Sequence, residues 1–323
     1  SLHLHTAIPN DLVATPFGRS LLYATMLVDR VYVHTDEYAR RLEKQLFIPP
    51  DLHGMEEFFP EVRRFDLGVD REAIDQALRI FHVRRISTSR SWIGEAERSL
   101  STAQKELAVD CLESRGVIPH RFMDIDRLDP NKGTATVVEA VSQFLYRREQ
   151  AGEKLEQMRA KYRFYFLQDL LHESADLRSP KTMYNKFVAS RFKDLVTRYP
   201  GIVFVAEALS GANRSLIFPL LLGTHAISGG AQDGLNLAVM ENCYVNRNED
   251  TSLVIGSGAG VAIQANALGY AKTAFFPKAG SCYQFVEALD NIVYKQSQGG
   301  YLLKTMKGPL ARYICRRNDS VIV

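Results

Sequence analysis

The stretch from Ser228 to Arg247, which reads SGGAQDGLNLAVMENCYVNR, joins a glycine-rich turn to an amphipathic helix. Asp233 lies in the turn, and Glu241 follows about two helical turns later, so both carboxylates can face one cleft. A glycine-rich turn at a helix N-terminus offers backbone N–H groups and the helix dipole to an anionic or polyhydroxyl ligand. The alternative is an ordinary Asp-Gly turn followed by a capped helix.

Two cations, Arg127 and Lys132, lie in a second stretch, DIDRLDPNKG at residues 124–133, directly after a predicted strand. In α/β sheets, ligands bind where a strand's carboxyl end meets a helix N-terminus. Two cations there fit a diphosphate, with arginine as a bidentate fork and lysine as a point charge. The alternative is a surface pairing of Arg127 with Asp126 or Asp129, and the sequence does not decide between the two.

Two further patterns could carry chemistry but are less specific. His3 and His5 form an H-x-H pair on one strand face, but no Cys, His or Asp partner lies nearby at ligand spacing. A single functional His5 at the strand's end is the better interpretation. GSGAG at residues 256–260 is similar to a dinucleotide fingerprint but lacks its third spaced glycine and its acid. Gly258 and Gly260 are better explained by close approach of the backbone to a ligand.

Predicted strands and helices alternate along the chain, which indicates an α/β fold with parallel sheets. We expect strands at residues 1–9, 30–33, 62–69, 117–126, 162–167, 202–206, 226–227 and 252–255. We expect helices at residues 17–27, 36–46, 71–81, 95–114, 135–148, 184–199, 214–222, 235–244, 284–294 and 302–315, and one that starts at residue 261.

The composition is that of an ordinary globular chain long enough for two domains: 323 residues, 46% apolar and 24% charged. The 40 Lys and Arg against 37 Asp and Glu include no polybasic block, so no nucleic acid or membrane partner is indicated. The four cysteines are far apart without a CxxC pair, which favours free thiols in a reducing compartment. With no signal-peptide or membrane-spanning pattern, we expect a cytoplasmic protein. Because the sequence starts at Ser1 in what reads as mid-domain sequence, we also expect a fragment or processed chain.

Taken in order, five motifs resemble the trehalose-6-phosphate synthases and their relatives, family twenty of the glycosyltransferases. They are HTAIP at residues 5–9, DLGVD at 66–70, RLDPNKG at 127–133, QDGLNL at 232–237 with Glu241, and GSGAG at 256–260. Order and approximate spacing match from residue 1 to about residue 270. The third and fourth motifs are the specific ones.

The resemblance implies a GT-B fold, with two Rossmann-like domains that face each other across a cleft. We expect a partial N-terminal domain at residues 1–116 and a C-terminal, donor-binding domain at residues 117–323. The implied reaction is a retaining transfer of a sugar or pseudo-sugar from a nucleoside diphosphate donor, such as UDP-glucose or GDP-glucose. The implied acceptor is a phosphorylated sugar, polyol or cyclitol. No metal and no cofactor are expected, and a homo-oligomer is possible.

The resemblance also implies a role for each matching residue. Arg127 and Lys132 would hold the donor diphosphate. The donor sugar would be bound by Asp233, Gly234, Leu235 and Asn236, with His5 above it. Leu237 and Ala238 would place backbone N–H groups near the phosphates, and Glu241 would hold the ribose hydroxyls. Arg178 would bind the acceptor phosphate. The residues expected to act in catalysis are His5, Arg127, Lys132 and Asp233.

The sequence departs from the family pattern at Gln232, which stands where the family has arginine, and at Thr6-Ala7, which replace Ile-Pro. The family's N-terminal glycine loop and its acceptor-binding aromatic residues have no counterpart here. These departures favour a second hypothesis, a non-catalytic regulatory or binding homologue that retains nucleotide binding. The retained residues favour an enzyme: Arg127, Lys132, Asp233 and Glu241. No Ser-His-Asp or Cys-His set and no glycosidase carboxylate pair is visible.

Overall fold

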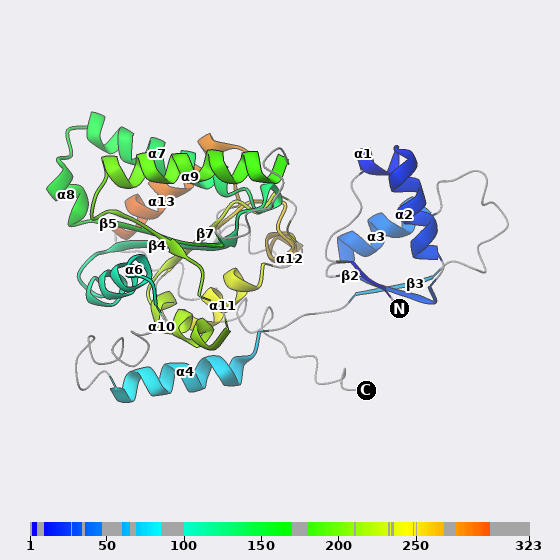
Figure 1. Ribbon diagram of the computed structural model, residues 1–323, viewed down its shortest axis with the longest axis horizontal. Coiled ribbons are helices and arrows are strands. Elements are labelled where there is room, and N and C mark those ends of the chain that lie inside the picture. The colour runs from blue at the N-terminus through cyan, green and yellow to red at the C-terminus, as the bar shows by residue number, and fades with distance from the viewer. Residues whose placement is uncertain are drawn as a thin grey trace.

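The computed structural model of this chain describes residues 2–4, 10–26, 28–33, 36–46, 60–64, 69–84, 100–169, 180–209, 211–231, 233, 236–247, 249, 251–267 and 276–297. These residues form two α/β units, each built on a parallel sheet (Figure 1). The predicted α/β class is therefore confirmed.

The first unit contains a small sheet in the order β1-β2-β3, with all strand pairs parallel. Its strands are β1 (Leu2–Leu4), β2 (Arg30–Val33) and β3 (Glu61–Arg64). Its helices are α1 (Asn10–Val13), α2 (Pro16–Met26) and α3 (Asp36–Leu46). Apolar side chains of α2, β2 and α3 form one buried cluster of their own.

The second unit contains a parallel sheet in the order β6-β5-β4-β7-β8. Its strands are β4 (His120–Arg127), β5 (Tyr162–Asp169), β6 (Val203–Glu207), β7 (His225–Ser228) and β8 (Leu253–Ile255). The chain runs outward from β4 to β6 and then returns to the other side of β4 to form β7. The order therefore reverses between β4 and β7, and the carboxyl ends of strands at such a switch point form a ligand-binding crevice.

Helices cover both faces of this sheet (Figure 1). One face carries α7 (Thr134–Gln150), α9 (Pro180–Arg198) and α13 (Cys282–Ser297). The other carries α4 (Arg71–Arg84), α6 (Thr102–Glu113), α10 (Ile217–Leu221) and α11 (Leu237–Val245). The remaining elements are α8 (Leu155–Arg159), α12 (Gly260–Ala267) and the 3-10 turns η5 (Pro130–Lys132) and η6 (Gly211–Leu216).

Strands β4 and β5 are buried on both faces, as central parallel strands require. Phe122 stacks on Phe164 toward α7 with ring centroids 4.9 Å apart, whereas Met123 lies in the opposite cluster. Asp124 and Asp126 follow on the same face as Phe122, because side chains of a strand alternate. Two buried carboxylates in a strand that is buried over most of its length contribute nothing to apolar packing, so their position points to a site.

Helices α4 and α6 pack against the second sheet rather than the first. Ile74 and Phe81 of α4 and Leu107 of α6 share one buried cluster with Met123 and Tyr165. The domain boundary after residue 116 stays a prediction, and this packing favours an earlier boundary, before α4.

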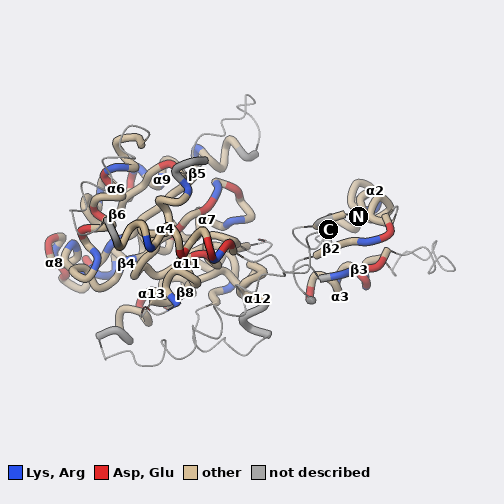
Figure 2. Tube along the Cα trace, turned by 90° about the horizontal axis from the view of Figure 1, so that it is seen from below, with Lys and Arg blue, Asp and Glu red and all other residues tan. Residues whose placement is uncertain are grey.

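The two units meet at α3 and α12, and Figure 2 shows α12 on the side of the second unit that faces the first. Ile263 of α12 packs against the apolar cluster of the first unit. The Tyr38 hydroxyl of α3 donates to the carbonyl oxygens of Asp233 and Gly258, each at 3.4 Å. The contact between the units therefore lies directly at the glycine-rich turns of the second unit.

Candidate functional site

Three glycine turns meet where β4, β7 and β8 end, and they pack backbone against backbone. A Cβ atom on Gly229 would lie 2.3 Å from the Gly133 carbonyl oxygen, and one on Gly256 would lie 1.9 Å from the Gly229 oxygen. The Ala231 amide also donates to the Asn131 carbonyl oxygen at 2.9 Å. Only glycine permits such an approach, so these residues fix the three turns at the switch point of the sheet.

Lys132 lies at the centre of this arrangement, between two carboxylates. Its Nζ donates to Asp233 Oδ2 at 2.6 Å and lies 3.5 Å from Asp126 Oδ1. Burial alone would lower the pKa of Lys132, but the charges of Asp126 and Asp233 offset this effect, and the pKa is raised. The lysine is therefore charged and paired inside the protein. The alternative of an Arg127 pairing is not seen among the described residues: Asp126 lies near Lys132 instead, and Asp129 caps η5 by accepting from the Asn131 amide.

Beneath Lys132, two carboxyl groups of β4 are buried side by side. Burial raises the pKa of Asp126 to about 6, against the lowering effect of Lys132. Burial, and then the charge of Asp126, raise the pKa of Asp124 well above its usual range. Within the described residues neither oxygen of Asp124 has a hydrogen-bond partner, and the same holds for the side-chain amide of Gln168 on β5. The site therefore sits on a polar layer inside the sheet.

The N-terminus of α11 is linked to Lys132 through Ser228 and Asp126, and it is capped by Asn236. The Asn236 side chain accepts from the Val239 amide at 3.1 Å and donates to Ser228 Oγ at 2.8 Å. The Ser228 hydroxyl in turn donates to Asp126 Oδ2 at 2.8 Å. The helix that the sequence predicted from Leu235 thus begins at Leu237, because Asn236 adopts a left-handed backbone and serves as the N-cap.

Glu241 lies on the next turn of α11 and pairs with Arg214 of η6. The Arg214 Nη2 donates to both carboxylate oxygens, at 2.7 and 3.0 Å. Burial raises the pKa of Glu241 against the lowering effect of this arginine. The Arg214 side chain is 48% exposed whereas that of Glu241 is 12% exposed, so the arginine is the partner that can reach a ligand.

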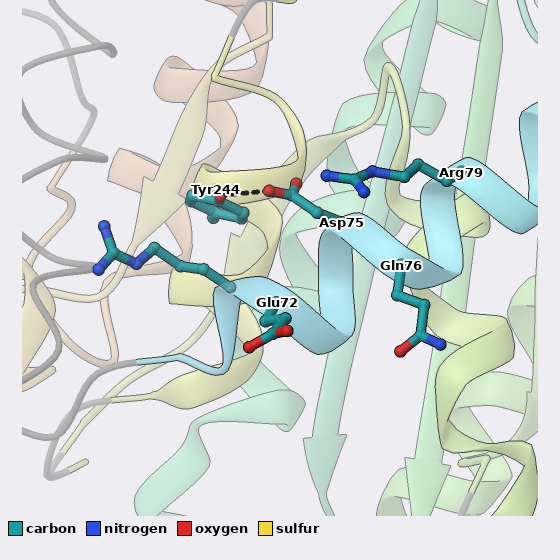
Figure 3. Close-up of a pocket in the computed structure, with 6 residues that line it drawn as sticks. Glu72, Asp75, Gln76, Arg79 and Tyr244 are labelled. Carbon is teal, nitrogen blue, oxygen red and sulfur yellow. Dashed lines mark hydrogen bonds between the residues drawn. The ribbon is translucent and has the colours of Figure 1, made fainter.

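The C-terminal end of α11 is tied to α4 beside an open pocket of about 570 Å³ (Figure 3). The Tyr244 hydroxyl donates to Asp75 Oδ2 at 2.9 Å, and Arg247 donates to Asp75 Oδ1 at 3.0 Å. The Arg247 guanidinium also lies over the Tyr244 ring, 4.2 Å from its centroid. Figure 3 shows Asp75 pointing from α4 toward Tyr244. Helix α11 is therefore held at both ends.

The structure brings Lys132, Asp233, Asn236 and the first turn of α11 together. Arg127 is exposed at the carboxyl end of β4, and in the described part of the chain it has no ion-pair partner. Leu237 is 42% exposed and Ala238 is half-buried in that first turn, and their predicted backbone contacts stay a prediction. Four predicted site residues lie outside the described residues: His5, Arg178, Gly234 and Leu235.

The sequence reasoning missed Ser228 and Arg214, and it considered Asp126 only as a partner for Arg127. The signal for Asp126 was its place in a strand otherwise buried and apolar. Ser228 ends β7, one residue before the glycine turn, and could have been identified by that position. Nothing in the sequence pairs Arg214 with Glu241.

Among the described residues, no group of three or more His, Cys, Asp or Glu side chains could hold a metal ion. The side chains of His3 and His5 are not among those described, so the H-x-H alternative is not tested. None of the described helices combines the length and apolar character that a membrane span requires.

No protein-family model and no curated protein matches the sequence. Solved structures do match. An alpha,alpha-trehalose-phosphate synthase (UDP-forming) from Burkholderia vietnamiensis is 16% identical, with a TM-score of 0.69 over 98% of this chain. An E. coli trehalose-6-phosphate structure bound with UDP-2-fluoro glucose is 14% identical, with a TM-score of 0.68 over 97% of this chain. A Burkholderia xenovorans synthase of the same UDP-forming kind, in complex with glucose-6-phosphate, is 17% identical, with a TM-score of 0.64 over 97% of this chain.

This chain spans 62%, 63% and 62% of the length of these three structures, respectively. At such identities the similarity shows the fold. The chain has the GT-B fold of the trehalose-phosphate synthases over the part that it spans, and the fold that the sequence motifs predicted is confirmed.

Proposed function

From the GT-B fold, we propose that this chain is a nucleoside diphosphate sugar-dependent glycosyltransferase that acts with retention on a phosphorylated acceptor. One observation carries the proposal: Lys132 and the capped N-terminus of α11 converge at the switch point of the second sheet. A cation beside a helix N-terminus at that place suits a diphosphate.

We assign the donor diphosphate to Arg127, Lys132 and the backbone N–H groups of Leu237 and Ala238. The exposed Arg127 meets the phosphates first, and Lys132 exchanges one carboxylate for a phosphate oxygen. Asp233, released by that exchange, accepts from hydroxyl groups of the sugar. This assignment gives Lys132 and Asp233 a partner both with and without the donor.

Glu241 is assigned to the ribose hydroxyls, with Arg214 holding its carboxylate in place. The same arginine is exposed enough to contact the nucleotide itself. His5 and Arg178 are assigned to the sugar and to the acceptor phosphate, respectively.

The chemistry requires no protein nucleophile. When the nucleoside diphosphate departs, negative charge grows on its phosphate oxygens, and positive groups fixed beforehand stabilise that charge. Lys132, Arg127 and the α11 N-terminus are such groups. The protein's work is therefore to hold two substrates in attack geometry, with the leaving group in a positive environment.

The bound molecules of the similar structures guide the choice of substrates. Those structures contain UDP-2-fluoro glucose in one case and glucose-6-phosphate in another. For this chain we propose UDP-glucose or GDP-glucose as donor and a phosphorylated sugar, polyol or cyclitol as acceptor. Cys111, Cys243 and Cys282 are free cysteines, and we propose that the protein acts in the cytoplasm.

A second candidate is a regulatory homologue that binds a nucleotide without transferring a sugar. Lys132 lies between two carboxylates, and this pairing must be rearranged before a donor is fully engaged. Gln232 also removes one positive charge that the family has near the donor.

Calorimetric titration with UDP and GDP, followed by a transfer assay on sugar, polyol and cyclitol phosphates, tests the proposal. We expect saturable binding of one of the two nucleotides and release of nucleoside diphosphate that depends on an acceptor. Binding without release would favour the regulatory homologue. Binding of neither nucleotide would refute both candidates.

A further inference from the structure

Asn236, at the start of α11, has an unusual backbone conformation. In the described part of the chain it is the one residue other than glycine with a positive φ, at 55°. Such a conformation is unfavourable for an L-residue unless the surroundings hold it. Both polar atoms of the Asn236 side chain are engaged within the protein, Oδ1 with the Val239 amide and Nδ2 with Ser228 Oγ. The side chain therefore fixes the helix start.

Ser228 links the side chain of Asn236 to Asp126 of β4. A hydroxyl has one hydrogen to donate, and Ser228 donates it to Asp126 Oδ2, which leaves its lone pairs to accept from Asn236. The other oxygen of Asp126 faces Lys132 Nζ. Asp126, Ser228 and Asn236 are 7%, 1% and 4% exposed, so the chain of hydrogen bonds runs where water does not compete.

We propose that Asp126 and Ser228 are positioning residues that hold the N-terminus of α11 in register with Lys132, so that both reach one diphosphate together. The inference rests on the proposed function, since it presumes a nucleoside diphosphate at this site. It adds two residues that touch no substrate and act through Lys132 and Asn236. It also gives Asn236 a positioning role in place of the sugar-binding side chain that the sequence motif implied.

Positioning residues are needed because a diphosphate that is bound by two separate groups requires both groups to be placed precisely. Lys132 belongs to the turn after β4, whereas the N–H groups of Leu237 and Ala238 belong to the helix after β7. These elements are more than a hundred residues apart in sequence, and the link between Asp126 and Ser228 spans 102 residues. Misplacement of one binding group by about 1 Å can cost a large part of the binding or rate advantage.

The test compares Ser228→Ala with Ser252→Ala. Both remove a buried serine hydroxyl, but in the described structure the Ser252 hydroxyl has no hydrogen-bond partner. Dissociation constants are measured for UDP and UMP, and for GDP and GMP, since only the diphosphates reach both Lys132 and α11. Ser228→Ala should reduce the preference for diphosphate over monophosphate by about tenfold, the effect of one buried hydrogen bond. Ser252→Ala should leave that preference unchanged.

Two more variants guard against misfolding as an explanation. Ser228→Thr keeps the hydroxyl and should restore the preference. Asn236→Gly tolerates the left-handed backbone but removes the link to Ser228, so it should behave as Ser228→Ala does. An unchanged diphosphate preference in both Ser228→Ala and Asn236→Gly would overturn the inference while the proposed function stands. Failure of the wild-type chain to bind UDP or GDP would overturn the proposed function, and this inference with it.

Discussion

At the scale of single residues, the charge balance around Lys132 decides which ligands can enter the site. The lysine is paired with Asp233 and lies near Asp126, so a ligand must replace carboxylate contacts that already exist. A neutral ligand gains nothing from this exchange, whereas a diphosphate brings at least as much negative charge as it displaces. Under the proposed function, the pairing would therefore favour polyanions and leave Asp233 for hydroxyl groups of the sugar.

Arg127→Ala and Lys132→Ala should each weaken nucleoside diphosphate binding by roughly 1.5–3 kcal/mol, the range for hydrogen bonds to charged groups. The exposed Lys193 of α9 provides a control, because its replacement by alanine leaves the site intact. Calorimetry with UDP and GDP measures the difference. Unchanged affinity in both site variants would remove the diphosphate assignment.

Asp233→Asn and Glu241→Gln should separate the sugar from the nucleotide. Asp233→Asn leaves Lys132 available to phosphate, so UDP or GDP affinity should persist while sugar transfer falls strongly. Glu241→Gln removes the carboxylate that Arg214 orients and should weaken the nucleotide itself. Titration and transfer assays on the same preparations distinguish the two. Similar behaviour of both variants would show that the division of roles is wrong.

The buried Asp126 should make folding stability depend on pH. Its pKa is about 6 in the folded protein against an ordinary value of 3.8, so between these pH values the folded state binds more protons than the unfolded state. The free energy of unfolding should thus fall as pH rises from about 4 to about 6, by on the order of 3 kcal/mol from this carboxyl. Chemical denaturation of wild type and Asp126→Asn should show a smaller fall in the variant. The exposed Asp194→Asn is the control, and an equal fall in all three proteins would contradict the assignment.

At the scale of elements, the site depends on where α11 begins and how it is held. The sequence predicted a helix from Leu235, because the apolar periodicity extends that far. Periodicity does not show which residue turns left-handed, since that choice depends on Ser228 and Asp126 from other strands. Strand ends and glycine turns could be predicted because their signals are local. The pairing of Lys132 with Asp233, 101 residues away, could not.

Asn236→Ala should lower the free energy of unfolding by about 1–3 kcal/mol, because alanine neither caps α11 nor favours the left-handed conformation. Asn236→Gly should cost less, since glycine adopts this backbone freely and is itself an acceptable N-cap. Urea denaturation of the two variants and wild type provides the comparison. A larger loss for glycine than for alanine would mean that backbone conformation is not what the asparagine is needed for.

At the scale of the whole molecule, the separate apolar clusters of the two units explain what the sequence could and could not predict. Alternating strands and helices predicted parallel α/β units, and the motif order predicted the GT-B fold that the similar structures confirm. The assignment of α4 and α6 to the second unit follows from side-chain packing, as with Leu107 and Tyr165. No local pattern in either helix specifies which sheet it covers.

Tyr38 contacts both units. Its replacement should separate the effect of its buried ring within the first unit from the effect of its hydroxyl contacts to the second. The ring is 6% exposed within the first unit's apolar cluster, while its hydroxyl lies 3.4 Å from the carbonyl oxygens of Asp233 and Gly258. Tyr38→Ala leaves a cavity and should cost about 3–5 kcal/mol in the first unit, whereas Tyr38→Phe should cost less than about 1 kcal/mol. Because the units have separate apolar clusters, scanning calorimetry should show more than one transition, and Tyr38→Ala should lower one of them and leave the other in place. If both transitions moved together, the units would unfold as one body and the contact at α3 and α12 would be stronger than these distances indicate.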